Sequence, residues 1–269
     1  MMLKIKNLIL KILYSFNDFF DLRGSKARSI FNDTLAIKEK SFSSSKIKIG
    51  IVKEKWGLHS YYVKACIDKN ISFQVIDIFD EDWFEKISDK NLEYIVIRPS
   101  VQYTPWKDAF DNKLMLLGQK STARIYPNPK LLWLWENKLR MMEWAKLNGL
   151  KHIDFKILYS LDRLKKYSKS AKYPLIYKSS SGSGSSGVKI FKNSNQLLKF
   201  GKSFFRKGIR TYRKQKLDIE HGSMIIQKYL DNLIEWRIIR IGRYYFGFQK
   251  LKSGNFHSGS KNFSYGMPP

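Results

Sequence analysis

Short apolar runs alternate with longer amphipathic stretches through the first half of the chain. The apolar runs predict strands over residues 47–52, 73–79 and 94–97, with a shorter one around Ile125 and Tyr126. The stretches between them predict helices over residues 58–69, 80–88 and 106–118. Because strands that alternate with helices are joined by crossover connections, this part is predicted to be an α/β unit with a parallel sheet.

A different order of elements follows the break at Pro127-Asn128-Pro129. A tryptophan-rich stretch, residues 131–148, predicts one helix, and a basic stretch without carboxylates, residues 193–216, predicts another. Between them Ser160 is the predicted cap of a short basic helix. Further strands are predicted over residues 153–158, 174–178, 188–191, 224–229, 236–241 and 244–250. Gly242 and Arg243 join the last two as a tight hairpin, so this half is predicted to be α+β and antiparallel.

Residues 179–187, the Gly/Ser loop, contain only serine and glycine and lie between two predicted strands. Glycine accepts positive φ, and successive free amides in such a loop form a concavity for phosphate oxygens. Lys178 enters the loop and adds a positive charge. A flexible linker has the same composition, but the tight flanking strands favour a loop that covers phosphate. The loop lacks the ending of a Walker motif, and no helix is predicted directly after it.

The N-terminal residues form an apolar stripe at helical spacing of about 100° per residue. The stripe consists of Ile5, Leu8, Ile9, Ile12, Leu13, Phe16, Phe19 and Phe20. A helix of this kind docks on another domain or subunit, which is the favoured interpretation, or lies on a membrane surface. Lys11 interrupts the apolar positions, which argues against a signal peptide. Residues 1–22 are therefore assigned to an amphipathic helix and the polar residues 23–45 to a linker.

The formal net charge of +27 favours anionic partners, namely nucleotides, anionic lipids or nucleic acid. Lysine is spread along the whole chain of 269 residues, so the net charge alone does little to distinguish among these partners. The single cysteine, Cys66, calls for no oxidising compartment, which favours the cytoplasm. The four histidines match no Cys/His spacing of a zinc site. No apolar run approaches the roughly 20 residues of a membrane-spanning helix.

Arg98 follows the strand predicted at residues 94–97, at the carboxyl edge where open α/β sheets bind ligands. Its guanidinium is suited to clamp a substrate carboxylate or phosphate. An arginine at a strand end also serves structural roles, and both interpretations stay open.

Several motifs follow one another in a set order along the second half. They are Glu136-Asn137-Lys138 in the tryptophan-rich helix, Lys178 with the Gly/Ser loop, Gln227-Lys228-Tyr229-Leu230, Glu235-Trp236-Arg237 and a hairpin ending in Lys250. This order resembles the ATP-grasp superfamily, and most closely the branch of glutathione synthetases and of the ligases that add glutamate to ribosomal protein. The resemblance runs from about residue 47 to the end. It implies a Rossmann-like pre-ATP-grasp domain over residues 46–129 and a two-lobed ATP-grasp domain over residues 130–269.

The resemblance also implies roles for single residues. Lys138 and Lys178 match the two nucleotide-binding lysines of the family, and Gln227, Lys228, Tyr229 and Leu230 match the hinge whose backbone reads adenine. Glu235 lies near the acidic position that binds ribose. The lid over the phosphates corresponds to Ser179, Ser181, Gly182, Ser183, Gly184, Ser185, Ser186 and Gly187. Arg237 and Lys250 resemble basic catalytic positions that face the triphosphate and the reacting carboxylate, and Arg98 is assigned to the substrate.

The implied activity is that of a carboxylate–amine ligase. ATP phosphorylates a substrate carboxylate, and an amine attacks the acyl phosphate to form an amide; cations and loop amides stabilise the transferring phosphoryl group. The family uses magnesium held by carboxylates on its last strands, and this sequence has no Asp or Glu after Lys250. Residues 255–260 resemble the segment that leads to those ligands, so the chain is expected to be a truncated form of a longer protein.

Two alternatives to an active ligase stay open. One is an ATP-grasp remnant that binds nucleotide or a partner but lacks the complete reaction, as the missing carboxylates suggest. The other is a nucleic-acid-binding module, for which only the charge argues, since no RNA or DNA motif is present. The predicted helix within residues 3–20 adds contact with a subunit or with the inner face of the membrane to the expected partners.

Overall fold

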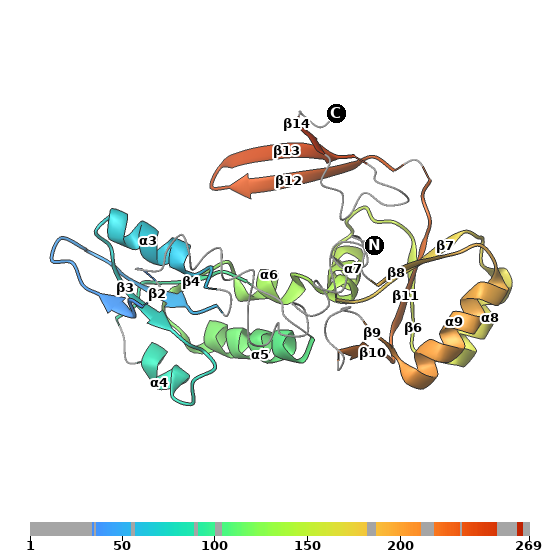
Figure 1. Ribbon diagram of the computed structural model, residues 1–269, viewed down its shortest axis with the longest axis horizontal. Coiled ribbons are helices and arrows are strands. Elements are labelled where there is room, and N and C mark those ends of the chain that lie inside the picture. The colour runs from blue at the N-terminus through green and yellow to red at the C-terminus, as the bar shows by residue number, and fades with distance from the viewer. Residues whose placement is uncertain are drawn as a thin grey trace, which may run out of the picture. The chain divides into compact units, whose positions relative to one another are not determined.

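A computed structural model of the chain divides it into two compact units, Met1–Leu134 and Trp135–Pro269 (Figure 1). The structure describes residues 34, 36–54, 57–88, 91–99, 104–181, 187–210, 218–231, 233–251 and 263–265. The predicted N-terminal helix and the segment at residues 255–260 lie outside the described residues. Across the described ranges the mixed α/β class predicted from the sequence is confirmed.

The first unit is built on a five-stranded sheet in the order β1-β3-β2-β4-β5. Its strands are β1 (Glu39–Lys40), β2 (Lys48–Val52), β3 (Ser72–Ile76), β4 (Tyr94–Ile97) and β5 (Arg124–Tyr126). The pairs β2·β3, β2·β4 and β4·β5 are parallel, as the alternating pattern predicts, and β1 adds antiparallel to β3. The segment predicted as a linker therefore contributes an edge strand to this sheet.

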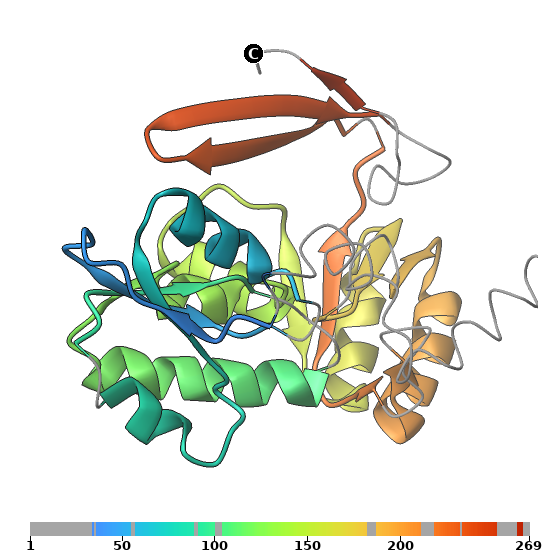
Figure 2. The same cartoon turned by 60° about the vertical axis from the view of Figure 1, so that its left-hand side comes forward.

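Helices cover both faces of this sheet, as Figures 1 and 2 show. They are α3 (Ser60–Asp68), α4 (Trp83–Ser88), α5 (Thr104–Lys120) and α6 (Pro129–Leu134). Successive strand residues point to opposite faces. Ile51 accordingly packs in a cluster with Val63 and Cys66 of α3, whereas Val52 belongs to the cluster of α4 and α5. A sheet buried on both sides explains why its strands are nearly continuous apolar runs.

A buried ion pair fixes α6 to α5. Lys107 Nζ lies 2.5 Å from Asp111 Oδ1 one helical turn away and donates a hydrogen bond of 3.1 Å to the carbonyl oxygen of Leu132. Both charged side chains are almost completely buried, at 5% and 2% exposure. Lys107 therefore pairs with the Asp111 carboxylate and also supplies a hydrogen-bond donor to a carbonyl oxygen of α6.

The tryptophan-rich stretch is not the single helix that its pattern predicts. It forms α6 and a second helix, α7 (Lys138–Leu147), with a break at residues 135–137. Glu136 has a positive φ of 56°, which no continuous helix allows. Asn137 caps α7, because its side chain accepts a hydrogen bond from the backbone N–H of Arg140 at 3.0 Å. The motif Glu136-Asn137-Lys138 is thus a helix start and not a helix interior.

The second unit contains an antiparallel four-stranded sheet in the order β6-β11-β7-β8. Its strands are β6 (Phe155–Leu158), β7 (Leu175–Lys178), β8 (Val188–Phe191) and β11 (Met224–Lys228). The helices α8 (Leu161–Ser170) and α9 (Ser194–Lys207) lie side by side in Figures 1 and 2 and cover one face of it. Tyr177, Phe191 and Phe204 form the centre of that core. The predicted antiparallel character of this half is confirmed.

The helix predicted over residues 193–216 ends earlier, at Lys207. Gly208 follows it with φ of 70°, and a Cβ there would lie 2.9 Å from the carbonyl oxygen of Glu220. Glycine therefore ends the helix and lets the chain pair with a distant segment. That pairing joins β9 (Ile209–Arg210) to β10 (Ile219–Glu220) in antiparallel fashion. Residues 211–216 of the predicted helix lie outside the described residues.

A separate three-stranded sheet completes the second unit. It consists of β12 (Glu235–Ile241), β13 (Tyr244–Lys250) and β14 (Phe263–Tyr265) in that order. Ile241 pairs with Tyr244, so Gly242 and Arg243 form the predicted two-residue hairpin turn. Within the described ranges, the structure has no helix long and apolar enough to cross a membrane.

Candidate functional site

The strand register of the second unit gathers predicted nucleotide-binding residues on one face of the sheet. Lys178 pairs with Ile225, and Gln227 pairs with Ile176. Directly opposed residues of antiparallel strands share a face, and alternate residues of one strand do so too. Tyr177 and Ile226, on the other face, pack against α8 and α9. Lys178 and Gln227 therefore lie on the face that these helices do not cover.

The ends of the Gly/Ser loop are held together. The backbone N–H of Ser179 donates to the carbonyl oxygen of Gly187 at 2.8 Å, and the Ser179 hydroxyl donates to the carbonyl oxygen of Ser181. Gly187 has φ of 73°, and a Cβ there would overlap Ser179 Oγ. Only glycine fits this position. The residues at the centre of the predicted lid, Gly182, Ser183, Gly184, Ser185 and Ser186, lie outside the described residues.

Lys138 joins this loop through its backbone. Its N–H donates to the carbonyl oxygen of Ser180 at 2.7 Å, so the first residue of α7 contacts the loop. The Asn137 cap fixes the same end of the helix. The break in the tryptophan-rich stretch therefore places Lys138 beside the loop that Lys178 enters.

The two lysines are partly desolvated, and the charge of Lys178 acts on Lys138. Burial lowers the pKa of the Lys138 ammonium and Lys178 lowers it further, whereas the carboxylates of Glu136 and Glu220 raise it. Burial also lowers the pKa of Lys178, and Glu235 opposes that effect. A bound anion would offset both the desolvation and the mutual repulsion of the two cations. The arrangement is therefore suited to an anionic ligand.

Glu220 is a residue of this site that the sequence analysis missed. Its Oε2 atom accepts hydrogen bonds from the backbone N–H and the hydroxyl of Ser180, at 2.8 and 3.0 Å. Its Oε1 atom lies 3.5 Å from the hydroxyl of Tyr177. Burial raises the pKa of the Glu220 carboxyl to about 7, against the opposing effects of Ser180 and Lys138. The sequence contains one indication of this residue: Asp218 and Glu220 are the first acidic residues after a long basic stretch without carboxylates.

The predicted hinge lies at the end of β11. Gln227 is buried, and its Oε1 atom has no hydrogen-bond partner in the part of the chain that the structure describes. The backbone N–H of Lys228 donates to the carbonyl oxygen of Asp154 at 3.1 Å, and that of Tyr229 to the carbonyl oxygen of Pro174 at 3.3 Å. A cavity of about 400 Å³ opens here between the ends of β6, β7 and β11. Leu230 follows the strand with an exposed side chain.

Three further predicted residues lie on the hairpin of β12 and β13. Glu235 is paired with Lys250 in the register, and Lys250 Nζ lies 2.8 Å from Glu235 Oε1. Arg237 is two residues along β12 and so faces the same side of the hairpin. Because Glu235 acts on the pKa of Lys178, it lies within electrostatic reach of that lysine.

Arg98 belongs to the first unit. It is exposed directly after β4, and its charge acts on the hydroxyl of Tyr62 in α3. Burial nevertheless raises the pKa of Tyr62. The carboxyl edge of the parallel sheet thus carries a cation, as the sequence predicts. Lys138 and Lys178 both belong to the second unit, whereas Arg98 belongs to the first.

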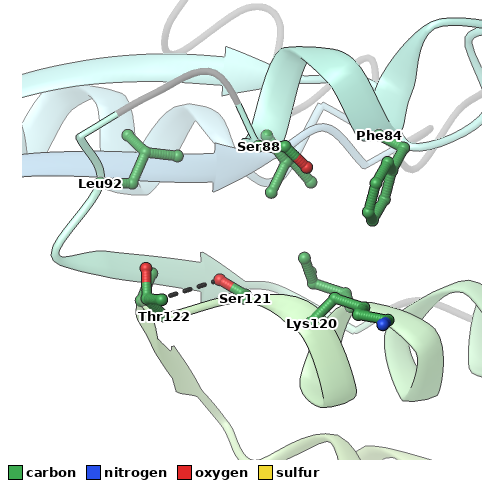
Figure 3. A pocket seen from close by; sticks show the side chains of 9 residues that line it. Phe84, Ser88, Leu92, Lys120, Ser121 and Thr122 are labelled. Atoms are coloured by element: carbon green, nitrogen blue, oxygen red, sulfur yellow. Dashed lines mark hydrogen bonds between the residues drawn. The ribbon is translucent and has the colours of Figure 1, made fainter.

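The other end of this parallel sheet has a cavity of about 140 Å³, seen in Figure 3. It lies between α4 and the end of α5, next to Leu92, Ser121 and Thr122, which precede β4 and β5. Open α/β sheets bind ligands at the opposite, carboxyl edge. We therefore interpret this cavity as a small packing gap.

The described ranges contain no group of three or more His, Cys, Asp or Glu side chains that could hold a metal ion. The sequence resemblance implies magnesium held by carboxylates on the last strands, and the sequence has no Asp or Glu after Lys250.

No family model matches the sequence. A curated relative, the 2-oxoglutarate carboxylase small subunit of Hydrogenobacter thermophilus, is 24% identical over 119 residues, which is 44% of this chain and 24% of the relative. The structure is similar to that of N5-carboxyaminoimidazole synthetase from Staphylococcus aureus complexed with ADP. The TM-score is 0.52 at 16% identity, over 81% of this chain and 58% of that one.

A second solved structure gives a similar result. The D-alanine–D-alanine ligase from Bacillus anthracis, complexed with ATP, matches 83% of this chain and 72% of its own with a TM-score of 0.50 at 15% identity. The chain therefore spans about a quarter of the curated relative and somewhat over half of the synthetase. At these identities the likeness establishes the fold.

Proposed function

This chain has the ATP-grasp fold, and on that premise we propose that its second unit binds ATP. Lys138 and Lys178 bind the phosphates, and the Gly/Ser loop, residues 179–187, covers them. Gln227, Lys228, Tyr229 and Leu230 form the adenine hinge, with Glu235 at the ribose. The buried Gln227 Oε1 atom, which has no partner among the described residues, is available to an adenine amino group.

The approach of Lys138 to Lys178 is the observation that carries this proposal. The two side chains come from α7 and β7, and each is partly withdrawn from water. Two neighbouring, desolvated cations are costly in an empty site and favourable around a polyphosphate. The hydrogen bond from Lys138 to Ser180 brings the Gly/Ser loop to the same place.

The reaction that fits this site is ATP-dependent ligation of a carboxylate to an amine. A substrate carboxylate oxygen attacks the γ-phosphorus, and ADP leaves with the electrons of the broken P–O bond. The amine then attacks the carbonyl carbon of the acyl phosphate, phosphate leaves, and a proton is lost to give the amide. Arg237 and Lys250 stabilise the charge that develops on the phosphoryl oxygens.

The first unit supplies the substrate side in this proposal. Residues 46–129 form the pre-ATP-grasp domain, and residues 130–269 form the ATP-grasp domain. Arg98, at the carboxyl edge of the parallel sheet, holds the substrate carboxylate. No step is assigned to magnesium, because the described residues contain no cluster of three or more side chains that could hold it. The cytoplasm supplies ATP, and residues 3–20 make the contact with a subunit or an anionic membrane surface.

Isothermal titration of the full chain with ATP tests the proposal. The matched variants are Lys178→Ala and Lys199→Ala, since Lys199 is an exposed lysine of α9 in the same unit. Both variants lose one positive charge. We expect ATP binding to be weakened at least tenfold in Lys178→Ala and unchanged in Lys199→Ala, because a bound charge-assisted contact is worth about 1.5–3 kcal/mol. Equal affinities in all three proteins would reject the phosphate site.

A further inference from the structure

Glu220 connects the two parts of the proposed phosphate site. It holds Ser180, the residue whose carbonyl oxygen accepts the hydrogen bond from Lys138. It also acts electrostatically on Lys138 itself. The acid is thus both the anchor of the strand-to-loop turn and a counter-charge of a lysine that would bind phosphate.

We propose that Glu220 is a proton-linked positioning residue, which neutralises Lys138 while the phosphate site is empty and takes up one proton when a nucleotide phosphate binds there. This inference rests on the function proposed above. The proton comes from solvent, and no bond other than the new O–H bond of the carboxyl group is formed.

The geometry favours this exchange of counter-charges. The desolvation free energy of a buried carboxylate is offset only while a cation lies near it. When phosphate oxygens take over Lys138, the Glu220 carboxylate faces a second anion in the same desolvated region, and its neutral form is then the stable one. Phosphate and proton therefore bind together.

The neutral acid keeps the contacts that position the loop. Its Oε2 atom still accepts from the N–H and the hydroxyl of Ser180. A proton on Oε1 is directed to the hydroxyl oxygen of Tyr177, 3.5 Å away, which can accept it. Protonation therefore reverses one weak hydrogen bond and leaves the other two unchanged.

Within the described part of the chain, few charged groups act on Glu220. Among the described residues they are Lys138 from α7 and Tyr177 from β7, together with the hydrogen bonds of Ser180. In the pairing of β10 with β9, Glu220 lies opposite Ile209, which has no titratable side chain. Lys138 is itself influenced by Glu136 and Lys178. When phosphate replaces Glu220 as the counter-charge of Lys138, the charge around Glu220 therefore changes.

The experiment is calorimetric titration of the full chain with ATP at pH 8 in HEPES and in Tris, two buffers that differ in ionisation enthalpy. The difference between the observed enthalpies gives the number of protons taken up. We expect the wild-type chain to take up about 0.5 to 1 proton per ATP, and its affinity to fall as the pH rises above about 7. No uptake by the wild-type chain would overturn the inference.

The variant Glu220→Gln mimics the protonated acid, since its amide oxygen can accept from Ser180. We expect it to take up no proton at this site and to bind ATP up to about tenfold more tightly at pH 8, because it has no protonation cost to meet. Uptake equal to that of the wild-type chain, or weaker binding, would contradict the inference. Glu143→Gln, which changes an exposed acid of α7, is the control and should resemble the wild-type chain.

The outcomes separate the two proposals. ATP binding without proton uptake leaves the proposed function in place and rejects the role of Glu220. Absence of ATP binding to the folded wild-type chain rejects both. If Glu220→Gln does not fold, the proton uptake of the wild-type chain and the pH dependence of its affinity for ATP still test the role of Glu220.

Discussion

The backbone N–H of Lys138 donates a hydrogen bond of 2.7 Å to the carbonyl oxygen of Ser180. These residues lie far apart in the sequence, one at the start of α7 and the other in the Gly/Ser loop. The contact makes the start of a helix part of a proposed phosphate site. The position of Lys138 therefore depends on the residues that fix that helix start.

Asn137→Ala removes the cap of α7. We expect a loss of about 1 kcal/mol in the free energy of unfolding, together with weaker ATP binding, because the cap holds Lys138 beside the loop. Asn193→Ala is the matched variant, since Asn193 caps α9 in the same manner. It should lose similar stability and keep its affinity for ATP. Chemical denaturation and calorimetry measure both quantities, and equal losses of affinity would contradict the account.

Gly187→Ala tests the closure of the Gly/Ser loop. A methyl group there would overlap Ser179 Oγ and lie 2.8 Å from Ser179 Cβ, in a backbone with φ of 73°. Gly149→Ala is the control, because Gly149 has φ of 66° but nothing within 4 Å of an added Cβ. The control should cost about 1–2 kcal/mol from backbone strain alone. Gly187→Ala should cost more and weaken ATP binding, and a smaller cost than that of the control would be evidence against the closed loop.

Glu220 gives the stability of the chain a defined pH dependence. The fold raises the pKa of this carboxyl from 4.5 to about 7, so between these values the folded state binds more protons than the unfolded state. Stability should therefore fall as the pH rises through this window, by about 3 kcal/mol in total. Glu220→Gln should remove this decline, and Glu143→Gln should retain it. Denaturation curves from pH 5 to 8 measure the difference, and identical pH profiles for the wild-type chain and Glu220→Gln would show the acid to be unperturbed.

Asp111→Asn should strongly destabilise the first unit. It removes the charge that balances the buried Lys107, and breaking a buried pair costs about 3–5 kcal/mol. Asp68→Asn is the control, because Asp68 pairs with Lys64 at the same helical spacing on the surface. An exposed pair of this kind contributes about 0.5 kcal/mol or less. Unfolding in urea compares the two variants, and similar losses would mean that the Lys107 pair is not buried.

The longer strands of both units could be predicted from the sequence because each is a short apolar run between polar segments, whereas the short strands β1, β9, β10 and β14 could not. The division of the tryptophan-rich stretch into α6 and α7 could not. Its apolar spacing continues through residues 135–137, whereas the break depends on the positive φ of Glu136 and on a contact with Ser180. Likewise, the end of α9 follows from the close approach of Gly208 to β10. Such long-range contacts leave no periodic signal in the chain.

The candidate site, like the fold, was predictable from the sequence only in part. Lys138 and Lys178 belong to ordered motifs, and the Gly/Ser loop has a distinctive composition. Glu220 lies in a strand of only two residues, and its partner Ser180 is forty positions away. A single acid in a basic region is readily taken for a surface residue. Its role depends on burial, which only the structure reveals.

The most direct test of the central claim is the thermal midpoint of the full chain with and without millimolar ATP, measured also for Lys138→Ala, Lys178→Ala and the control Lys199→Ala. ATP at about 100 times its dissociation constant should add about 2.7 kcal/mol to the stability of the wild-type chain. The account predicts that this gain persists in Lys199→Ala and falls to about half or less in both Lys138→Ala and Lys178→Ala. An undiminished gain in the two site variants, or no gain in the folded wild-type chain, would contradict it.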